Sequence, residues 1–244
     1  MNIYTLWTRF VNFEERRKRE IPFLLEQLKD YRDPRVFDAA LGSGATSLGL
    51  RFAGIEHLVS NEIDPHYRQL AEQEALRYGV PLTTTAHHWK EIGSLYPSSF
   101  DAITCLGNSL TLLFDKEERL SALRNFREAL KPEGRLIIDE RNYPALFLSD
   151  YSGGNYHWSG TVMYCGKKDI DAYPVSITAE KIVMEYTDKE SGESVRLSLY
   201  PFKEGELKAL LSEAGFRTIL TYDDYREHSP SYTPEFFTHV CTIA

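Results

Sequence analysis

Residues 36–44 read Val-Phe-Asp-Ala-Ala-Leu-Gly-Ser-Gly, and this segment indicates the fold more strongly than any other. A hydrophobic strand runs into a tight Gly-x-Gly turn, after which a helix is predicted to begin. Glycine lets the backbone approach a ligand closely, and Asp38 can accept hydrogen bonds from a ligand's polar groups. Because some Gly-x-Gly turns in α/β chains are only tight turns, the segment needs support from elsewhere in the sequence.

An acidic residue ends the next predicted strand. Residues 57–62 read His-Leu-Val-Ser-Asn-Glu, so that Glu62 follows the glycines at a distance of about 20 residues. A carboxylate at that position suits bidentate capture of the two hydroxyls of a ribose. Asp64 is the second candidate, although its place before Pro65 is typical of a helix N-cap. We predict that Glu62 binds a ribose.

A nicotinamide-dependent dehydrogenase is the competing interpretation of this half of the chain. Residues 42–47 read Gly-Ser-Gly-Ala-Thr-Ser, so the third glycine of the dinucleotide-binding fingerprint is absent. That glycine allows a helix to pack closely on a strand beneath a pyrophosphate. A methionine-derived cofactor has no pyrophosphate, and the chain finishes with helix, strand, loop and strand, as is typical of methyltransferases. The sequence therefore favours S-adenosylmethionine, with S-adenosylhomocysteine as the product.

Strand-type and helix-type segments alternate through the first part of the chain. Strands are predicted at 35–40, 57–62, 82–86, 100–106 and 134–140, and helices at 46–53, 66–78 and 117–130. Such alternation is typical of a parallel sheet with helices on both faces. A further helix at 12–30 precedes the first strand, and residues 1–30 are interpreted as an N-terminal cap.

The pattern changes after Asn142. Alternating strands at 175–186 and 194–200 flank the polar turn 188–192 and predict an antiparallel hairpin. Residues 143–203 thus form a β-rich insertion between the fifth and sixth strands of the sheet. Because this position lies above the carboxyl ends of the strands, we expect a lid or substrate wall.

A helix at 204–214 and strands at 216–222 and 236–243 close the chain. The predicted fold class is α/β, with a Rossmann-like class I methyltransferase sheet and helices on both faces. A C-terminal antiparallel hairpin strand and the inserted β-rich segment complete one domain over residues 1–244.

Composition limits the expected partners. The net charge of −8 argues against a nucleic-acid partner, since such proteins usually carry a basic face. No apolar run approaches the ~20 residues that span a bilayer, and no signal-peptide pattern is found, so we expect no membrane partner. The widely spaced Cys105, Cys165 and Cys241 fit a reduced, cytoplasmic protein without structural zinc. The sequence leaves the oligomeric state open.

Two charged clusters have ordinary structural explanations. The basic run 16–19 follows Glu14 and Glu15, and it is interpreted as the solvated face of a helix with ion pairs at i,i+4. Asp223 and Asp224 resemble a magnesium site, but paired acids in a loop are usually solvated. The histidines show no ligand spacing, and we expect no metal.

Four further segments carry a resemblance to a known family. They are 100–109 (Phe-Asp-Ala-Ile-Thr-Cys-Leu-Gly-Asn-Ser), 139–143 (Asp-Glu-Arg-Asn-Tyr), 196–201 (Arg-Leu-Ser-Leu-Tyr-Pro) and 232–240 (Tyr-Thr-Pro-Glu-Phe-Phe-Thr-His-Val). Together they resemble the glycine N-methyltransferase family, and the resemblance spans the chain from Trp7 to Val240. The Cys-Leu-Gly-Asn-Ser and Asp-x-Arg-Asn-Tyr segments are more specific than the glycine turn.

The resemblance implies a set of cofactor-binding residues. Trp7 and Phe10 would lie near the methionine end of the cofactor, and Arg17 would pair with its carboxylate. The other implied positions line the turn (Asp38, Ala40, Gly42), hold the ribose (Glu62), pack on the adenine (His88, Trp89) or touch the cofactor (Leu106).

The resemblance also implies three substrate residues. Asn108 would contact the substrate, Arg141 would clamp an amino-acid carboxylate with its planar fork, and Tyr164 would line the pocket from the insertion. Methyl transfer from a sulfonium mainly requires positioning and exclusion of water, so we expect no dedicated general base. Three positions depart from the family: Phe10 replaces a tyrosine, Leu112 a histidine and Leu41 a cysteine. The first two change the polarity of the pocket, so glycine as the acceptor does not follow.

The sequence thus predicts methyl transfer to a small molecule, first of all to the amine of an amino acid or a related carboxylate-bearing substrate. O- or N-methylation of another metabolite or natural product is the alternative. Nucleic-acid methylation is less favoured, because the (Asp/Asn/Ser)-Pro-Pro-aromatic turn of base modifiers is absent at 106–109. A non-catalytic binding protein also remains, although the glycine turn and Glu62 count against it. Each of three site residues also has a purely structural explanation: Arg141 as a surface ion-pair residue, Asn108 as a turn residue and Trp89 as a core residue.

Overall fold

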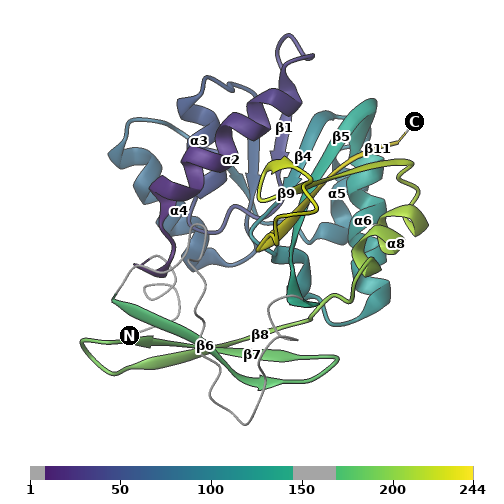
Figure 1. Cartoon of the computed structure of the whole chain (residues 1–244). Helices are drawn as coiled ribbons and strands as arrows, with labels where there is room; N and C mark the ends of the chain where they lie inside the picture. Colours follow the sequence, from purple (N-terminus) through teal and green to yellow (C-terminus); the bar gives the residue numbers. More distant parts are fainter. Residues whose placement is uncertain (1–8, 145–168, 244) are drawn as a thin grey trace.

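The central sheet has eight strands in the order β10-β9-β11-β5-β4-β1-β2-β3 (Figure 1). The structure is a computed structural model and describes residues 9–144 and 169–243. β1 pairs in parallel with β2 and β4, whereas β11 runs antiparallel between β5 and β9. The strands are β1 (Val36–Asp38), β2 (Leu58–Asn61), β3 (Thr83–Thr85), β4 (Phe100–Cys105), β5 (Leu130–Arg141), β9 (Thr218–Asp223), β10 (Arg226–Glu227) and β11 (Phe236–Thr242). The predicted parallel sheet with a C-terminal antiparallel strand is confirmed.

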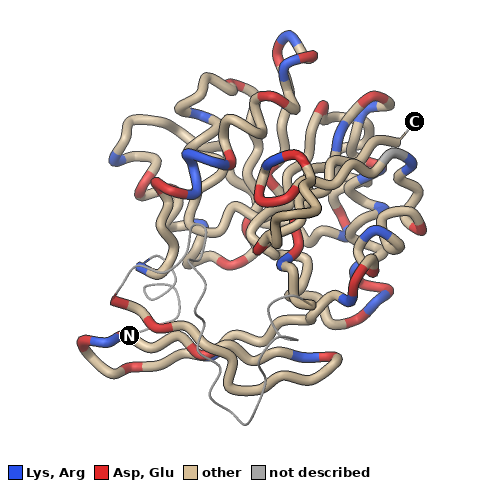
Figure 2. The backbone as a smooth tube through the Cα atoms, viewed as in Figure 1, with Lys and Arg blue, Asp and Glu red and all other residues tan. Residues whose placement is uncertain are grey.

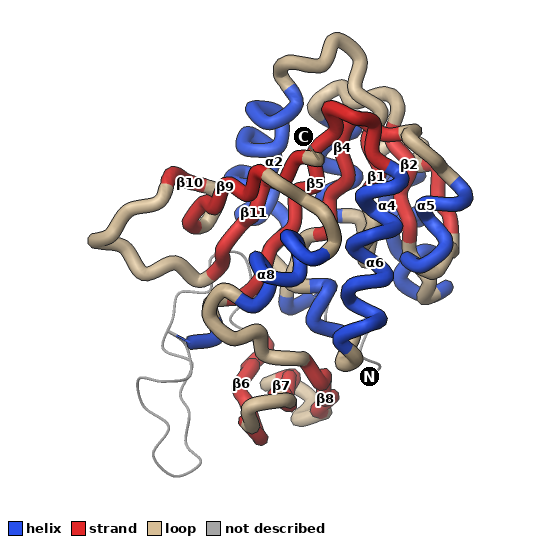
Figure 3. Tube along the Cα trace, turned by 90° about the vertical axis from the view of Figure 1, so that its right-hand side faces the viewer, coloured by secondary structure: helices blue, strands red, loops and turns tan. Residues whose placement is uncertain are grey.

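Helices cover both faces of this sheet, as predicted (Figure 3). One buried cluster joins the sheet to α2 and α3, and a second joins its other face to α5, α6 and α8. The helices are α2 (Phe13–Leu28), α3 (Ala45–Phe52), α4 (Pro65–Arg77), α5 (Ile92–Leu95), α6 (Lys116–Ala129) and α8 (Glu206–Glu213), with the 3-10 turns η1 (Trp89–Glu91) and η2 (Ser109–Leu112).

Strand β1 illustrates why the centre of the sheet is apolar throughout. Val36 and Phe37 are both fully buried. Val36 belongs to the cluster with α2 and α3, and Phe37 belongs to the cluster with α5 and α6. Successive side chains of a strand point to opposite faces, so a strand covered on both faces has no polar side. This strand leads directly into the glycine turn and so places the turn at the carboxyl ends of the central strands.

A second, antiparallel sheet has the order β6-β7-β8 and lies apart from the central one (Figure 1). Its strands are β6 (Ile170–Ile177), β7 (Ile182–Asp188) and β8 (Ser194–Leu199). The prediction of one continuous strand at 175–186 is wrong. A turn closed by a 2.8 Å hydrogen bond from Thr178 N to Lys181 O divides it, and the Thr178 hydroxyl also accepts from Lys181 N. The polar turn at 188–192 joins β7 to β8, as predicted.

The segment before α2 is fixed to this second sheet. Arg9 forms ion pairs with Asp169 and Asp188. Phe10 packs edge-on against Tyr186, with 5.1 Å between the ring centres. The start of the cap and the inserted sheet therefore form one continuous wall.

Lysine, arginine and acidic residues of the outer elements are interspersed in the view of Figure 2. On α2, Lys18 pairs with Glu14 at 3.2 Å, the predicted i,i+4 pair, and with Glu15 at 2.9 Å. The solvated-face interpretation is wrong for Arg16, whose side chain is only 12% exposed because it turns inward. Among the described residues, no helix is long and apolar enough to cross a membrane.

Candidate active site

A cavity of about 630 Å³ opens at the carboxyl ends of β1, β2, β4 and β5. Open α/β sheets bind their ligands at this edge. The start of α2 and the inner face of the inserted sheet complete its walls. Strands β6, β7 and β8, the described part of the insertion, therefore border the same cavity as the ends of the central strands.

The glycine turn presents bare backbone to this cavity. Gly42 has a φ of +52° and Gly44 a φ of +94°, in the left-handed region that side-chain-bearing residues rarely adopt. A Cβ at Gly42 would meet nothing within 4 Å, so the backbone there borders open space. At Gly44 a Cβ would lie 3.2 Å from the Cβ of Ala71 on α4, which adds a packing constraint.

Asp38 supports the turn from beneath and does not line the cavity. Its buried carboxylate accepts hydrogen bonds from Ser47 Oγ at 2.6 Å and Thr104 Oγ1 at 3.3 Å. Burial raises the pKa of Asp38. Its neighbours Ala40 and Gly42 do line the cavity.

Glu62 lies at the end of β2 and faces the same space. Its Oε2 accepts from Gly42 N and its Oε1 from Asp64 N, both at 2.9 Å. Partial burial raises its pKa. These bonds fix the carboxylate beside the glycine turn. Asp64 also borders the cavity, and its Oδ1 caps α4 through His66 N at 2.8 Å, as predicted.

The loop after β3 brings His88 and Trp89 to the cavity. Trp89 Nε1 donates to Ala39 O at 2.7 Å, and its ring packs on Phe126 with 5.8 Å between centres. Trp89 is thus both a packing residue and a cavity wall. Asn61, for which the sequence carries no functional signal, also lines the cavity, and its side chain accepts from His87 N at 2.9 Å and donates to His87 O at 3.1 Å.

Arg16, and not Arg17, lines the cavity. Arg16 Nε donates to Glu20 at 2.7 Å, and its Nη2 donates to Thr46 Oγ1 at 3.0 Å. The Arg17 guanidinium instead lies 5.5 Å from the ring centre of Phe52. One residue along a helix is a rotation of about 100°, enough to point the neighbouring side chain away from the cavity.

Asn108 opens η2 in a left-handed conformation, with φ 64°. Asp139, at the end of β5, accepts from Gly107 N at 2.9 Å and Asn108 N at 2.6 Å. Burial raises the pKa of Asp139 to about 6. The Asn108 side chain then donates to Tyr143 Oη at 2.6 Å and accepts from Arg141 N at 3.1 Å. Asp139 lies within the Asp-x-Arg-Asn-Tyr segment, but the sequence alone did not indicate a role for it in the site.

Arg141 is the last residue of β5 and lines the cavity. Its guanidinium carbon lies 4.4 Å from the ring centre of Phe236 on β11. Stacking on an aromatic face orients the planar group. Tyr143 and Asn108 border the cavity next to it, so three residues of two predicted segments converge there.

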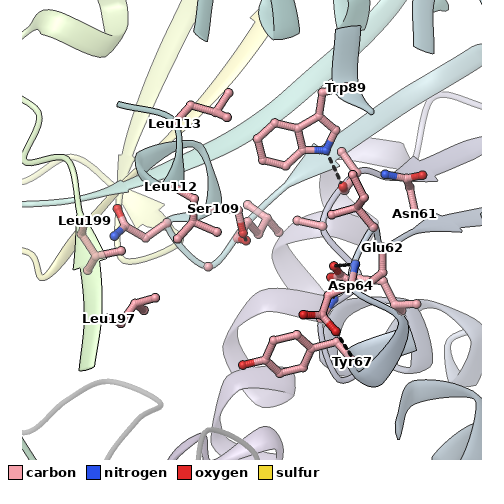
Figure 4. A pocket seen from close by; sticks show the side chains of 18 of the residues that line it. Asn61, Glu62, Asp64, Tyr67, Trp89, Ser109, Leu112, Leu113, Leu197 and Leu199 are labelled. Carbon is pink, nitrogen blue, oxygen red and sulfur yellow. Dashed lines mark hydrogen bonds between the residues drawn. The ribbon is translucent and has the colours of Figure 1, made fainter. Parts of the chain in front are cut away.

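The far wall of the cavity is apolar. Figure 4 shows Leu112, Leu197 and Leu199 on the side opposite Glu62 and Trp89. The wall consists of Phe10, Leu112, Leu113, Ala172, Met184, Leu197 and Leu199, with Tyr186 beside them. Leu112 is 50% exposed, so an apolar side chain faces open space there.

Two predicted site residues, Trp7 and Tyr164, lie outside the described residues. Leu106 and Leu41 line the cavity. Within residues 9–144 and 169–243, no group of three or more histidines, cysteines or acids could hold a metal ion. Asp223 and Asp224 are buried in the C-terminal hairpin, where they accept hydrogen bonds from nearby residues.

Comparisons with known proteins agree with this geometry. Residues 36–134 match the family described as "Methyltransferase domain". The chain is 31% identical over 234 residues to the glycine/sarcosine N-methyltransferase of Halorhodospira halochloris, which covers 96% of this chain and 84% of the relative. It is 26% identical over 263 residues to the glycine N-methyltransferase of Rattus norvegicus, covering 96% and 88% of the two chains.

A solved S-adenosylmethionine-dependent methyltransferase from Clostridium acetobutylicum shares the fold, with a TM-score of 0.71 and 17% identity over 93% of this chain and 92% of that one. By its similarity over nearly the whole length, the chain belongs to the glycine/sarcosine N-methyltransferase family of class I S-adenosylmethionine-dependent methyltransferases.

Proposed function

We propose that this N-methyltransferase acts on the amine nitrogen of an amino acid, or of a related small molecule that carries a carboxylate. The observation that carries the proposal is the place of Arg141 in the cavity, three strands from Glu62 in the order β5-β4-β1-β2. At a spacing of ~4.8 Å per strand, roughly 14 Å separate the two strand ends. That span leaves room for a nucleoside at one end and an acceptor at the other. The relatives are named for glycine and sarcosine, which are acceptors of this kind.

The cofactor would lie along the glycine turn. We assign Glu62 to the ribose hydroxyls, because its carboxylate is already fixed beside the turn. We assign Arg16, in place of Arg17, to the carboxylate of the methionine moiety, since Arg16 is the member of the pair that borders the cavity. The other predicted contacts keep their roles: Trp7, Ala40, Gly42, His88, Trp89 and Leu106. Asp38 acts indirectly by supporting the turn.

When bound, S-adenosylmethionine supplies an activated methyl group on a sulfonium. The chain's own residues then have to hold a neutral amine in line and keep water out. Arg141 would anchor the acceptor's carboxylate through its fork of N–H groups. Asn108 would hold Arg141 and Tyr143 in place through its hydrogen bonds to both, and Tyr143 and Tyr164 would orient the amine. No residue is assigned as a general base.

The apolar wall favours an acceptor that is larger than glycine. A carboxylate on Arg141 would direct the rest of an amino acid toward Leu112, Leu197 and Leu199, and apolar substituents are stabilised against such a wall by about 0.8 kcal/mol per buried methylene. We therefore expect the catalytic efficiency, kcat/KM, to rise from glycine to alanine and to amino acids with longer apolar side chains. The departures at Phe10 and Leu112 point the same way.

A panel of acceptors tests the proposal. Purified enzyme with labelled cofactor is offered glycine, sarcosine, a series of apolar amino acids and the amide of each. Methylation of acids and not of their amides supports the carboxylate requirement, whereas equal use of both contradicts it. A preference for glycine over all larger acids would leave the amine and carboxylate in place but overturn the role of the apolar wall.

We propose one domain in which residues 143–203 cover the site and residues 1–30 form the cap, with the Arg9 ion pairs joining the two. We also propose that catalysis needs no metal, that neither nucleic acid nor a membrane is a partner, and that the enzyme works in the cytoplasm.

A further inference from the structure

We propose that Tyr225 is a positioning residue for cofactor binding. Its hydroxyl group in the C-terminal hairpin holds the buried carboxylate of Glu20, and Glu20 in turn holds Arg16 at the cavity. The inference rests on the proposed pairing of Arg16 with the cofactor's carboxylate. It adds a residue that lies far from the glycine turn in sequence and does not border the cavity.

The geometry around Glu20 carries the inference. This carboxylate is fully buried on α2. It accepts from Arg16 Nε at 2.7 Å, from Thr46 Oγ1 at 2.5 Å and from Tyr225 Oη at 3.1 Å. A buried charge is tolerated when it is paired and hydrogen-bonded, and these donors come from three separate parts of the chain.

The same contacts leave Arg16 little freedom. Its Nε is fixed by Glu20 and its Nη2 by Thr46 Oγ1 at 3.0 Å, so two sides of the guanidinium are fixed. The terminal nitrogens lie near the backbone at Gly107, where a Cβ would be 3.4 Å from Arg16 Nη1. The guanidinium thus borders the cavity between α2 and the loop after β4. A guanidinium held in place before binding loses less entropy when it pairs with a carboxylate.

The backbone of the C-terminal hairpin places the Tyr225 hydroxyl next to the Glu20 carboxylate. Asp224 and Tyr225 both have left-handed backbones, with φ of 48° and 64°. Such conformations persist in non-glycine residues only where the surroundings enforce them. Here the buried Asp224 carboxylate accepts from Tyr232 Oη at 2.5 Å and from Phe236 N at 2.8 Å. Asp223 and Asp224, whose pairing resembles a metal site in the sequence, are therefore part of a hydrogen-bonded turn that contacts α2 through Tyr225.

Tyr225→Phe tests the inference, because it removes one hydroxyl and keeps the ring. Tyr222→Phe is the matched control, since both rings pack on Phe23, with centres 4.9 Å (Tyr222) and 5.5 Å (Tyr225) away. Calorimetry measures the affinity for S-adenosylhomocysteine and for 5′-methylthioadenosine, which lacks the amino-acid carboxylate. We expect Tyr225→Phe to raise the Kd of S-adenosylhomocysteine about three- to tenfold and to leave 5′-methylthioadenosine unchanged. Tyr222→Phe should change neither.

Thr46→Val provides a second, independent variant and should show the same selective loss. Equal weakening of both ligands by Tyr225→Phe would indicate general loosening and overturn the inference. An unchanged S-adenosylhomocysteine affinity in Tyr225→Phe, combined with a loss in Arg16→Gln, would overturn the role of Tyr225 alone. If Arg16→Gln binds S-adenosylhomocysteine normally, the proposed role of Arg16 fails, and the role of Tyr225 fails with it.

Discussion

The two ends of the cavity are built in different ways. At the proposed ribose end, Glu62 is fixed by the backbone N–H groups of Gly42 and Asp64. At the proposed acceptor end, the Arg141 guanidinium lies over the ring of Phe236, its backbone N–H donates to the Asn108 side chain, and the apolar face of the inserted sheet lines the same cavity. The first end depends on hydrogen bonds from backbone N–H groups to a single carboxylate. The second depends on side chains from remote segments, and there we expect single substitutions to change the acceptor specificity without changing the cofactor affinity.

The sharpest way to separate the two ends is Arg141→Lys. Lysine keeps the charge but loses the planar fork that sets the acceptor's angle, so we expect kcat/KM to fall by about ten- to a thousandfold. The affinity for S-adenosylhomocysteine should stay nearly constant. Arg135→Lys is the control, because Arg135 lies in the middle of β5, does not line the cavity and pairs with Asp30. A matching fall in cofactor affinity would show that the two ends are coupled.

The converse experiment is Glu62→Ala, which should weaken S-adenosylmethionine and S-adenosylhomocysteine alike by about 1.5–3 kcal/mol. The loss follows from removing a charge-assisted pair with the ribose hydroxyls. Calorimetry gives the affinities, with Glu56→Ala as the control on the loop before β2. Unchanged affinities would indicate that Asp64 binds the ribose, or that the enzyme uses another cofactor.

These ends were not equally predictable. The turn at 42–44 and Glu62 follow from residues near one another, because a strand, a left-handed turn and an acid at a strand end are local features. Asp139 lies in a recognised segment, and only the hydrogen bonds that it accepts from Gly107 N and Asn108 N reveal its part in the site.

Other features needed the tertiary structure. Arg16 and Arg17 are equivalent as sequence, and only the phase of α2 against the cavity distinguishes them. The partner of Glu20 lies in a hairpin 205 residues away, which no pattern along the helix indicates. The break between β6 and β7 was missed because apolar residues alternate on both sides of the turn at Thr178.

The acceptor end should also respond to pH. Because burial raises the pKa of Asp139 to about 6, above the ordinary value near 3.9, the folded state binds the proton more tightly than the unfolded state. The protonated Asp139 therefore contributes to the stability of the folded state. This contribution is complete below about pH 4 and is lost as the pH rises through about 6. We expect wild type to lose about 2–3 kcal/mol of unfolding free energy over that window relative to Asp139→Asn. Denaturant unfolding from pH 4 to 7 checks this, and parallel curves for the two proteins would contradict it.

The smallest expected effect is none. Treatment with EDTA should leave methyl transfer unchanged at either end of the cavity, because positioning is assigned to Arg141 and Glu62 rather than to an ion. Activity abolished by the chelator and restored by magnesium would falsify this and would return attention to the acidic pair at Asp223.

The ion pairs of Arg9 have a consequence for anyone who recombines this enzyme with its relatives. Arg9 precedes α2, yet its partners Asp169 and Asp188 lie directly before β6 and at the end of β7. Transplanting the insertion alone would separate a buried aspartate from its cation and leave Phe10 facing a foreign ring. The residues that have to be exchanged together are therefore not continuous in the sequence. A donor's inserted sheet has to travel together with the first residues of its own cap if the new acceptor preference is to come with it.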